Sequence, residues 1–409
     1  MKTKTKKKNK KKISKVLFSK VARVASLATT VVASEILTSE KAEASITIGE
    51  TAGSPNNQSV KKTSAAAVST AIAIGNNANA SNSGSAFAIA IGGDTASTGN
   101  GAISIGKDAQ SLASSGVAVG YNSKASGGQA VAIGGNIQNA GGAQATGDQS
   151  ISIGGDTIAS GSSSIAIGGD DLNQANSIAG VVFKNLTGVD FIGTTTYIKT
   201  ESGGAGSIAI GVQSTSSGHL STAFGTKTKA SGAYSTALGV GASSEGEGSI
   251  ALGGAASSKG KTSIAIGTKV KTVGESATSM GYGAEASSKG TVAIGLDSRA
   301  GDGNAATGTA GANGINAVAI GKGTQANHDS NIAIGNSAET GRDLTVSNYD
   351  IKNISIGYEA GKGMNGQFNS YLGTNAGQDS KGDGNSAFGL RAGKTVTGNT
   401  NTAIGMDSG

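Results

Sequence analysis

The sequence predicts an all-β solenoid, in which the chain winds through short coils that each contain two strands and two turns. Three observations predict this fold. A glycine that follows a small residue and an apolar residue recurs most often every 14 residues, without a break from Gly211 to Gly295. Before this glycine, apolar or β-branched residues alternate with Ala or Ser, which is typical of a strand. Small residues dominate the composition, with 68 glycines in 409 residues, so a repeat fold is favoured over a globular core of large side chains.

The first half of each unit predicts the better-defined strand. In the segments 222–225 (TAFG) and 236–239 (TALG), the small second residue faces a narrow space and its two neighbours face the other side. We expect the apolar residue before the glycine to form the structural core of the repeat. These residues are Ile210, Phe224, Leu238, Leu252, Ile266, Met280 and Ile294.

The second half of each unit predicts a shorter strand between two turns. Segments such as 228–230 (TKA) and 284–286 (AEA) place small residues on one side and a charged residue on the other. Glycines such as Gly218 and Gly232 separate the two halves, at turns that favour a positive φ. A coil this short has a thin core and leaves an apolar stripe in water. We therefore infer that several chains associate laterally, as a rod on the order of 100 Å long at ~4.8 Å per coil.

Residues 1–44 are predicted to be a secretory signal peptide with an extended basic n-region. The first twenty residues contain ten lysines, residues 24–33 are modestly apolar, and Ala42, Glu43 and Ala44 match a cleavage pattern before Ser45. A basic nucleic-acid-binding tail is the alternative. The segment holds 12 basic and 3 acidic residues, whereas the remainder holds 21 and 23. We therefore expect an exported protein without a nucleic-acid partner, and no stretch after residue 44 predicts a membrane-spanning helix.

Repeat units at 207–211 (SIAIG), 263–267 (SIAIG) and 331–335 (NIAIG) resemble the head repeat of YadA-like trimeric autotransporter adhesins, over nearly all of residues 46–409. The resemblance implies a left-handed parallel β-roll solenoid of 14- to 16-residue turns, assembled as a homotrimer. It implies type V secretion, display at a Gram-negative cell surface and a role in virulence. It also implies multivalent cell adhesion, through a host matrix protein such as collagen, fibronectin or laminin, or an epithelial receptor of the CEACAM type.

The predicted organisation is a signal peptide at 1–44 and a head domain at 45–409, with 16-residue repeats at 357–409. The neck, coiled-coil stalk and membrane anchor of the family are not recognised in this sequence. We therefore expect outer-membrane anchoring only through a C-terminal segment outside this chain. The 16-residue units also look like phage tail-fibre repeats. The alternative function is a structural fibre or spacer, or a self-associating protein, without a receptor of its own.

An insertion at residues 177–204 interrupts the repeat and is the most apolar stretch after the leader. One interpretation is a protruding hairpin or flap that contacts a partner through aromatic anchors. The other is a segment packed across the roll or between subunits. The candidate partner-binding residues are Phe183, Leu186, Phe191, Ile192, Tyr197 and Ile198.

No catalytic constellation is visible in the sequence. The chain has no cysteine, His219 and His328 stand alone in predicted turns, and no carboxylate pair recurs. We therefore expect no enzyme activity, no cofactor and no bound metal. Two other solenoid classes are disfavoured. A polysaccharide-cleaving β-helix would need acidic and basic catalytic groups, and an ice-binding solenoid would need a regular Thr ladder, and the sequence shows neither feature.

Overall fold

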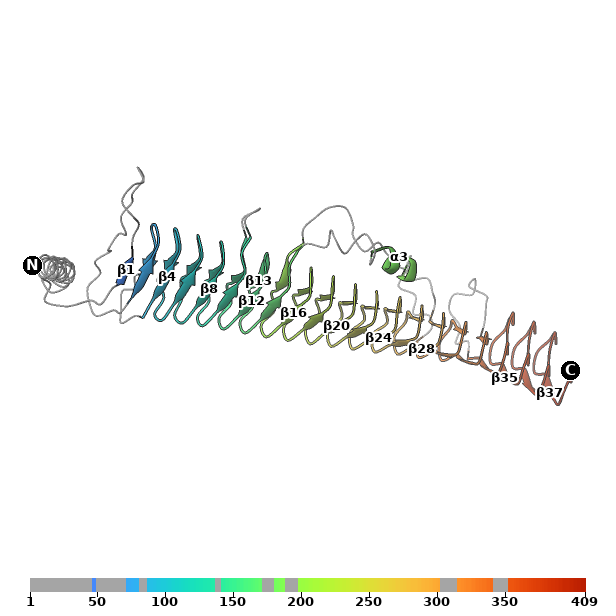
Figure 1. Cartoon of the computed structure of the whole chain (residues 1–409). Helices are drawn as coiled ribbons and strands as arrows, with labels where there is room; N and C mark the ends of the chain where they lie inside the picture. Colours follow the sequence, from blue (N-terminus) through green and yellow to red (C-terminus); the bar gives the residue numbers. More distant parts are fainter. Residues whose placement is uncertain are drawn as a thin grey trace, which may run out of the picture.

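The computed structural model describes residues 46–48, 71–80, 87–136, 141–170, 180–187, 198–301, 315–340 and 352–409. In these ranges the chain forms one long solenoid, in which two parallel sheets run side by side along the rod (Figure 1). This confirms the predicted parallel β-solenoid with 14-residue coils, and it adds one short helix, α3 (Val181–Thr187).

The first sheet, sheet A, consists of 21 strands of three residues each, and every strand pairs in parallel with its neighbours along the rod. Its strands are β1 (Ile46–Ile48), β2 (Ile72–Ile74), β4 (Ile89–Ile91), β6 (Ile103–Ile105), β8 (Val117–Val119), β10 (Val131–Ile133), β12 (Ile151–Ile153), β14 (Ile165–Ile167), β16 (Ile208–Ile210), β18 (Thr222–Phe224), β20 (Thr236–Leu238), β22 (Ile250–Leu252), β24 (Ile264–Ile266), β26 (Thr278–Met280), β28 (Val292–Ile294), β30 (Val318–Ile320), β32 (Ile332–Ile334), β34 (Ile354–Ile356), β35 (Ser370–Leu372), β36 (Ser386–Phe388) and β37 (Thr402–Ile404).

The second sheet, sheet B, consists of 16 strands of two or three residues. Its strands are β3 (Asn79–Ala80), β5 (Ala96–Ser97), β7 (Gln110–Ser111), β9 (Lys124–Ala125), β11 (Gln144–Ala145), β13 (Thr157–Ala159), β15 (Thr200–Ser202), β17 (Thr215–Ser216), β19 (Lys229–Ala230), β21 (Ser243–Ser244), β23 (Ser257–Ser258), β25 (Lys271–Thr272), β27 (Glu285–Ala286), β29 (Arg299–Ala300), β31 (Gln325–Ala326) and β33 (Glu339–Thr340). Equivalent residues of successive coils pair, as Ala209 does with Ala223 and Ala223 with Ala237.

Two turns connect the sheets in each coil. Turn 1 begins at the repeat glycine and leads from sheet A to sheet B, as at residues 225–227, and turn 2 leads back to sheet A, as at residues 232–234. Stacking of the coils forms a turn 1 edge and a turn 2 edge along the rod.

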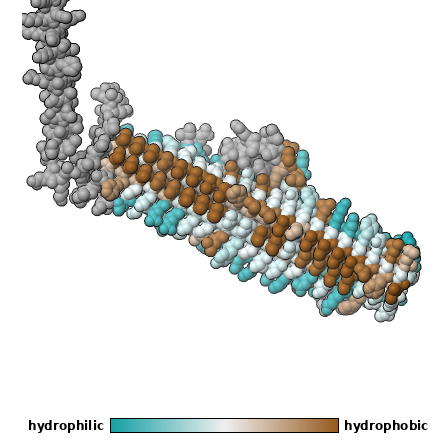
Figure 2. Space-filling view, turned by 60° about the horizontal axis from the view of Figure 1, so that its bottom comes forward, coloured by the Kyte–Doolittle hydropathy of each residue, from teal (hydrophilic) through white to brown (hydrophobic). Residues whose placement is uncertain are grey.

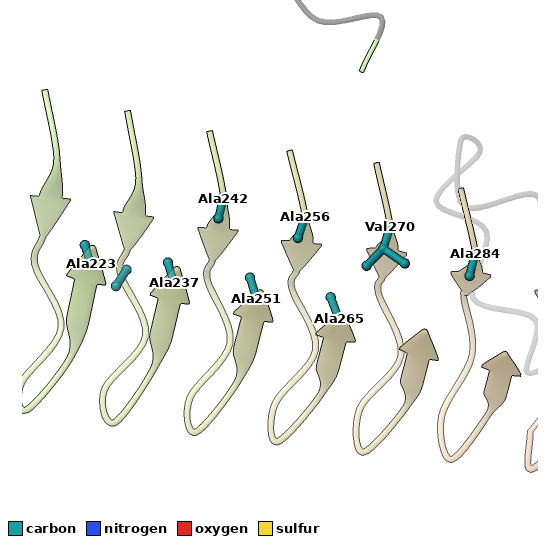
Figure 3. Close-up of a cluster of buried hydrophobic side chains, with 9 residues drawn as sticks. Ala223, Ala237, Ala242, Ala251, Ala256, Ala265, Val270 and Ala284 are labelled. Atoms are coloured by element: carbon teal, nitrogen blue, oxygen red, sulfur yellow. The ribbon is translucent and has the colours of Figure 1, made fainter. Parts of the chain in front are cut away.

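Methyl groups fill most of the space between the two sheets. From β4 to β36 the middle residue of each sheet A strand is fully buried, and in the regular coils it faces small residues of sheet B. Figure 3 shows this interior for Ala223, Ala237, Ala251 and Ala265 on sheet A and for Ala242, Ala256, Val270 and Ala284 on the facing side. Because the sheets lie so close together, side chains much larger than Ala or Ser have no room between them.

Glycines at both turns allow the coils to stack. Gly211 has a φ of +128°, and a Cβ there would lie 2.3 Å from the carbonyl oxygen of Gly225 in the next coil. At turn 2, a Cβ on Gly232 would lie 2.1 Å from the carbonyl oxygen of Gly246. At these distances an added Cβ would overlap the backbone of the next coil, so glycine favours close stacking at both turns. Turn 1 has glycine at this position in every described coil, whereas turn 2 carries Ala113, Ser288 and His328 in three coils.

Serine pairs satisfy polar groups inside several coils. The Ser244 hydroxyl lies 2.6 Å from that of Ser249, which donates a hydrogen bond of 2.7 Å to the carbonyl oxygen of Gly246. The same pairing occurs between Ser202 and Ser207, Ser216 and Ser221, and Ser258 and Ser263. Ser235 faces Ala230 instead, and its buried hydroxyl has no hydrogen-bond partner within the described residues.

An asparagine ladder replaces the serine pairs in the last coils. The backbone N–H of Asn353 donates to Oδ1 of Asn331 at 2.7 Å, that of Asn369 to Oδ1 of Asn353 at 2.8 Å, and that of Asn385 to Oδ1 of Asn369 at 2.7 Å. All four side chains are buried. The side chain of each of these asparagines thus accepts a hydrogen bond from the backbone of the equivalent asparagine in the next coil.

The 16-residue units differ from the predicted pattern of two strands per coil. Within residues 352–409, sheet A continues through β37, but the second half of each coil forms only the isolated bridges of Lys381 with Asn365 and Thr397. Asparagine amides instead donate to backbone carbonyls of this half, as Asn369 does to Gly382 at 3.0 Å. The interior of these coils is also wider, because it holds the fully buried side chain of Tyr371.

Gly232→Ala is expected to destabilise the solenoid by about 1–3 kcal/mol, because the added methyl group would overlap the carbonyl of Gly246. Gly254→Ala is the matched control, since a Cβ there would meet only Thr268 Cγ2 at 3.8 Å. We expect the control to be neutral or slightly stabilising. Urea unfolding midpoints of the two variants measure the difference, and equal losses would contradict the steric explanation.

Ser249→Ala is expected to cost about 1–3 kcal/mol, because it leaves the buried hydroxyl of Ser244 without its partner. Ser235→Ala removes a hydroxyl that makes no hydrogen bond, so we expect it to leave stability unchanged or raised. The free energies of unfolding of the two variants, compared with the unsubstituted chain, test this ranking. A larger loss for Ser235→Ala would show that the pairing is not what stabilises the coil.

Candidate functional site

The outer face of sheet A forms a continuous apolar stripe. We define this apolar stripe as the two residues that flank the inward-facing residue of each sheet A strand. It runs as a brown band along the described part of the rod (Figure 2). In β22, for example, Ile250 and Leu252 are both 38% exposed, whereas Ala251 between them is buried. Monomeric proteins rarely leave an apolar surface of this extent in water.

The expected repeat core lies on this stripe and not inside the coil. Phe224 is 50% exposed and Met280 is 41% exposed, and Leu238 and Leu252 are also exposed. Ile210, Ile266 and Ile294 are half-buried. In the single chain these seven residues thus lie outside the narrow interior, and their place in a core formed between several chains stays a prediction. The strand alternates between two faces, and only its Ala face fits the narrow interior.

The opposite face of the rod is polar, and its charges are balanced. Lys271 Nζ lies 2.7 Å from Glu285 Oε1 in the next coil, across the outer face of sheet B. At the turn 2 edge, Lys261 pairs with Glu247 at 3.0 Å. Such exposed pairs contribute about 0–1 kcal/mol each, so this face needs no covering partner for stability. The two faces of the rod therefore differ sharply in their need for a partner.

The pKa shifts belong to surface pairs, to one buried phenol and to Lys227, whose pKa is lowered by partial burial. A hydrogen bond from Arg391 lowers the pKa of Asp407, and one from Lys362 lowers the pKa of Glu359. Burial raises the pKa of Tyr371, whose hydroxyl lies 2.7 Å from Ser380 Oγ. None of these groups is poised as an acid or base beside a cavity, so these shifts point to structural roles.

Helix α3 lies along the turn 1 edge, beyond the coils from which its own insertion departs (Figure 1). The ring of Phe183 contacts the backbone at Gly241, where a Cβ would lie 2.9 Å from Phe183 Cζ. The Tyr282 hydroxyl donates a hydrogen bond of 3.0 Å to the carbonyl oxygen of Leu186. The insertion therefore packs across the roll, at least through α3, and residues 181–187 are helical where a hairpin or flap was one expectation.

The structure describes three of the six candidate partner-binding residues. Phe183 is half-buried against the roll, Leu186 is 49% exposed, and Ile198 is 46% exposed just before β15. Phe191, Ile192 and Tyr197 lie outside the described residues. On α3, the exposed Val181 and Val182 join Leu186 on the surface that faces away from the roll.

A second exposed apolar pair was not found from the sequence. Leu220 and Tyr234 occupy equivalent positions of adjacent coils on the turn 2 edge and are 58% and 63% exposed. Both have a positive φ, 54° and 59°, which large side chains seldom adopt. The signal was a large apolar residue two positions after a turn glycine, where most other coils carry Gly, Ser, Thr, Gln or Asn. Phe368, which is 54% exposed, occupies the same position in a 16-residue coil.

The described residues hold no group of three or more His, Asp or Glu side chains placed to bind a metal ion. Nδ1 of His219 accepts a hydrogen bond of 3.1 Å from the backbone of Ala205, which is a structural contact at the turn 2 edge. In the same part of the chain, no helix is both long and apolar enough to span a bilayer. The surfaces described above, and no buried chemical group, are therefore the candidate sites.

A comparison with protein families matches the YadA head domain repeat at residues 113–136, 145–170, 202–219, 216–242, 244–269, 273–298 and 312–338. The matched segments cover the regular coils on both sides of the insertion and do not include α3. A comparison with curated proteins gave no match.

Proposed function

We propose that the chain is the head of a trimeric autotransporter adhesin that binds host proteins at the bacterial surface, because segments between residues 113 and 338 match the YadA head domain repeat. The observation that carries this proposal is the apolar stripe. It supports lateral assembly, and the family supports adhesion. The proposal has two separable parts, the assembly of three chains and the recognition of a receptor.

Three chains around a common axis would cover the apolar stripe. Full burial of one large aliphatic side chain contributes about 1.5–3 kcal/mol, and each coil offers one or two such residues. Sheet A continues through 21 strands, so the summed contribution would exceed that of a transient interface. A closed, symmetric assembly would remove the stripe from water along the whole rod. The resemblance to YadA-like heads favours three chains over two.

Receptor binding would then fall to the surfaces left outside this interface. These are the turn edges, the polar face of sheet B and helix α3. We propose the insertion as the receptor-binding element, with Phe183, Leu186, Phe191, Ile192, Tyr197 and Ile198 as its apolar contacts. Three copies on one rod would strengthen weak single contacts by avidity. The proposed partner class is a host matrix protein such as collagen or fibronectin, or a CEACAM-type epithelial receptor.

The alternative is a spacer or self-associating fibre without its own receptor. The balanced charges of sheet B and the regular coils favour it, because a spacer needs a stiff rod and a soluble outer face. Under this alternative the trimer would still form, and no surface residue would matter for binding to host proteins.

Leu238→Glu combined with Leu252→Glu is expected to convert a three-chain particle into single chains, because two charges per chain would enter the apolar interface. The matched control is Ser243→Glu with Ser257→Glu, which places the same charges on the polar face of the same coils. Sedimentation equilibrium measures the mass of each particle. A control and a stripe variant of equal mass would contradict assembly through the stripe.

Val182→Ser combined with Leu186→Ser is expected to weaken binding to the host protein at least tenfold, since apolar anchors contribute about 1–2 kcal/mol each. The comparison variant, Leu220→Ser with Tyr234→Ser, alters the other exposed apolar pair and is expected to bind normally. Surface plasmon resonance against collagen, fibronectin, laminin and a CEACAM ectodomain measures both. Loss only in the comparison variant would move the site to the turn 2 edge, and no binding by the unsubstituted trimer would favour the spacer.

A further inference from the structure

Helix α3 is too short to be stable by itself. It has seven residues, including two adjacent valines, an asparagine and a threonine, all of which are poor helix formers. Isolated helices shorter than about 12–15 residues are marginal in water even when they are rich in alanine. The surface on which α3 lies must therefore supply the free energy that keeps it helical.

Two contacts with the roll involve residues near opposite ends of the helix. Phe183 lies on Gly241, and Leu186 accepts the hydrogen bond from Tyr282. Thr187, the other residue turned toward the roll, is buried. Gly241 and Tyr282 belong to coils three repeats apart, on the order of 14 Å along the rod, so the helix bridges coils that make no direct contact.

The landing surface coincides with departures from the repeat. The position of Gly241 is occupied by Lys227, Ala255 and Lys269 in nearby coils, with φ values of 55°, 52° and 59°. The backbone there tolerates a side chain, so the turn does not require glycine at 241. A glycine at this position leaves the space that the ring of Phe183 fills.

Tyr282 is the second residue of the landing surface, and tyrosine also occupies this turn position at Tyr121 and Tyr358. Its position in the four preceding coils carries Thr226, Val240, Gly254 and Thr268, none of which could reach a helix carbonyl with a phenol. Tyr282 is 39% exposed, and its hydroxyl bonds to a carbonyl of the last helical turn, which has no partner within the helix. One coil thus supplies space, and another supplies a hydrogen-bond donor.

We propose that α3 is an intrachain latch, which is helical only while it is seated on Gly241 and Tyr282 at the turn 1 edge of its own chain. The ring of Phe183 cannot contact the roll and a partner at the same time. When α3 leaves the roll, the ring of Phe183 becomes exposed beside Val182 and Leu186. When α3 binds the roll again, the ring is covered. This contact lies within one chain, so it depends neither on the trimer nor on the receptor proposed above.

Hydrogen exchange of the full chain, followed by mass spectrometry of a peptide that covers α3, tests the latch. Gly241→Lys and Tyr282→Thr each install a residue that nearby coils carry at the same position, so both coils are expected to fold. We expect the amides of residues 185–187 to exchange at least tenfold faster in each variant. Amides of β20 and β22 are expected to keep their rates.

Gly248→Thr is the matched control. Gly248 has a φ of +63°, close to the +67° of Gly241, but it lies on the turn 2 edge, where a Cβ would meet only Thr262 Cγ2 at 3.6 Å. We expect α3 to exchange at the unsubstituted rate in this variant. Equal acceleration in the control and in Gly241→Lys would overturn the proposal, because strain at any left-handed turn would then explain the effect.

Tyr282→Phe keeps the test decisive if Gly241→Lys disturbs its own coil. It removes one exposed hydroxyl and leaves the backbone of the turn untouched. We expect at least threefold faster exchange of α3 in Tyr282→Phe. Unchanged α3 rates in both Tyr282→Phe and Tyr282→Thr would overturn the latch.

Discussion

The narrow space between sheets A and B is the constraint on which the rest of the structure depends. It admits Ala223, Ala237 and their equivalents and excludes larger apolar side chains from nearly every 14-residue coil. Those larger side chains must lie outside, where they form the apolar stripe. A coil therefore cannot bury its own hydrophobic residues, and the stripe must be covered by other chains or stay wet. Glycine at turn 1 meets a second constraint, because the backbones of successive coils approach too closely there for a Cβ.

Much of this architecture could be predicted from the sequence, because the same pattern of strand and turn residues recurs along the chain. The 14-residue spacing and the alternation around Ala223 and Ala237 predicted the strands of sheet A and the turns that follow them. The pattern also predicted that the small residues face the narrow space and that an apolar stripe stays in water, as the structure shows. The place of the large apolar residues in a core depends on packing between chains, which a single chain does not contain. The reduction of sheet B to isolated bridges in the last coils was also not visible in the sequence pattern.

The insertion was harder to predict, because it has no repeat from which to reason. Its apolar residues marked it as different, and a packed segment was one of the two interpretations. The helix could not be foreseen, since Val181 and Val182 disfavour one and the stabilising contacts come from residues about 60 and 100 positions later. Gly241 and Tyr282 are ordinary turn residues in isolation. Their role in seating α3 is suggested only when they are compared with the residues at the same positions of neighbouring coils.

The direction of the inter-coil hydrogen bonds has a mechanical consequence. The strands cross the rod and their hydrogen bonds run along it, so tension applied along the rod acts on one coil at a time. Each released coil replaces ~4.8 Å of rod with about 46–50 Å of extended chain, which is nearly a tenfold gain in length per step. Under shear flow, such a rod would lengthen by unfolding one coil after another while the remaining coils stayed folded. A segment that ties coils three repeats apart would interrupt this stepwise yielding and make several coils resist together.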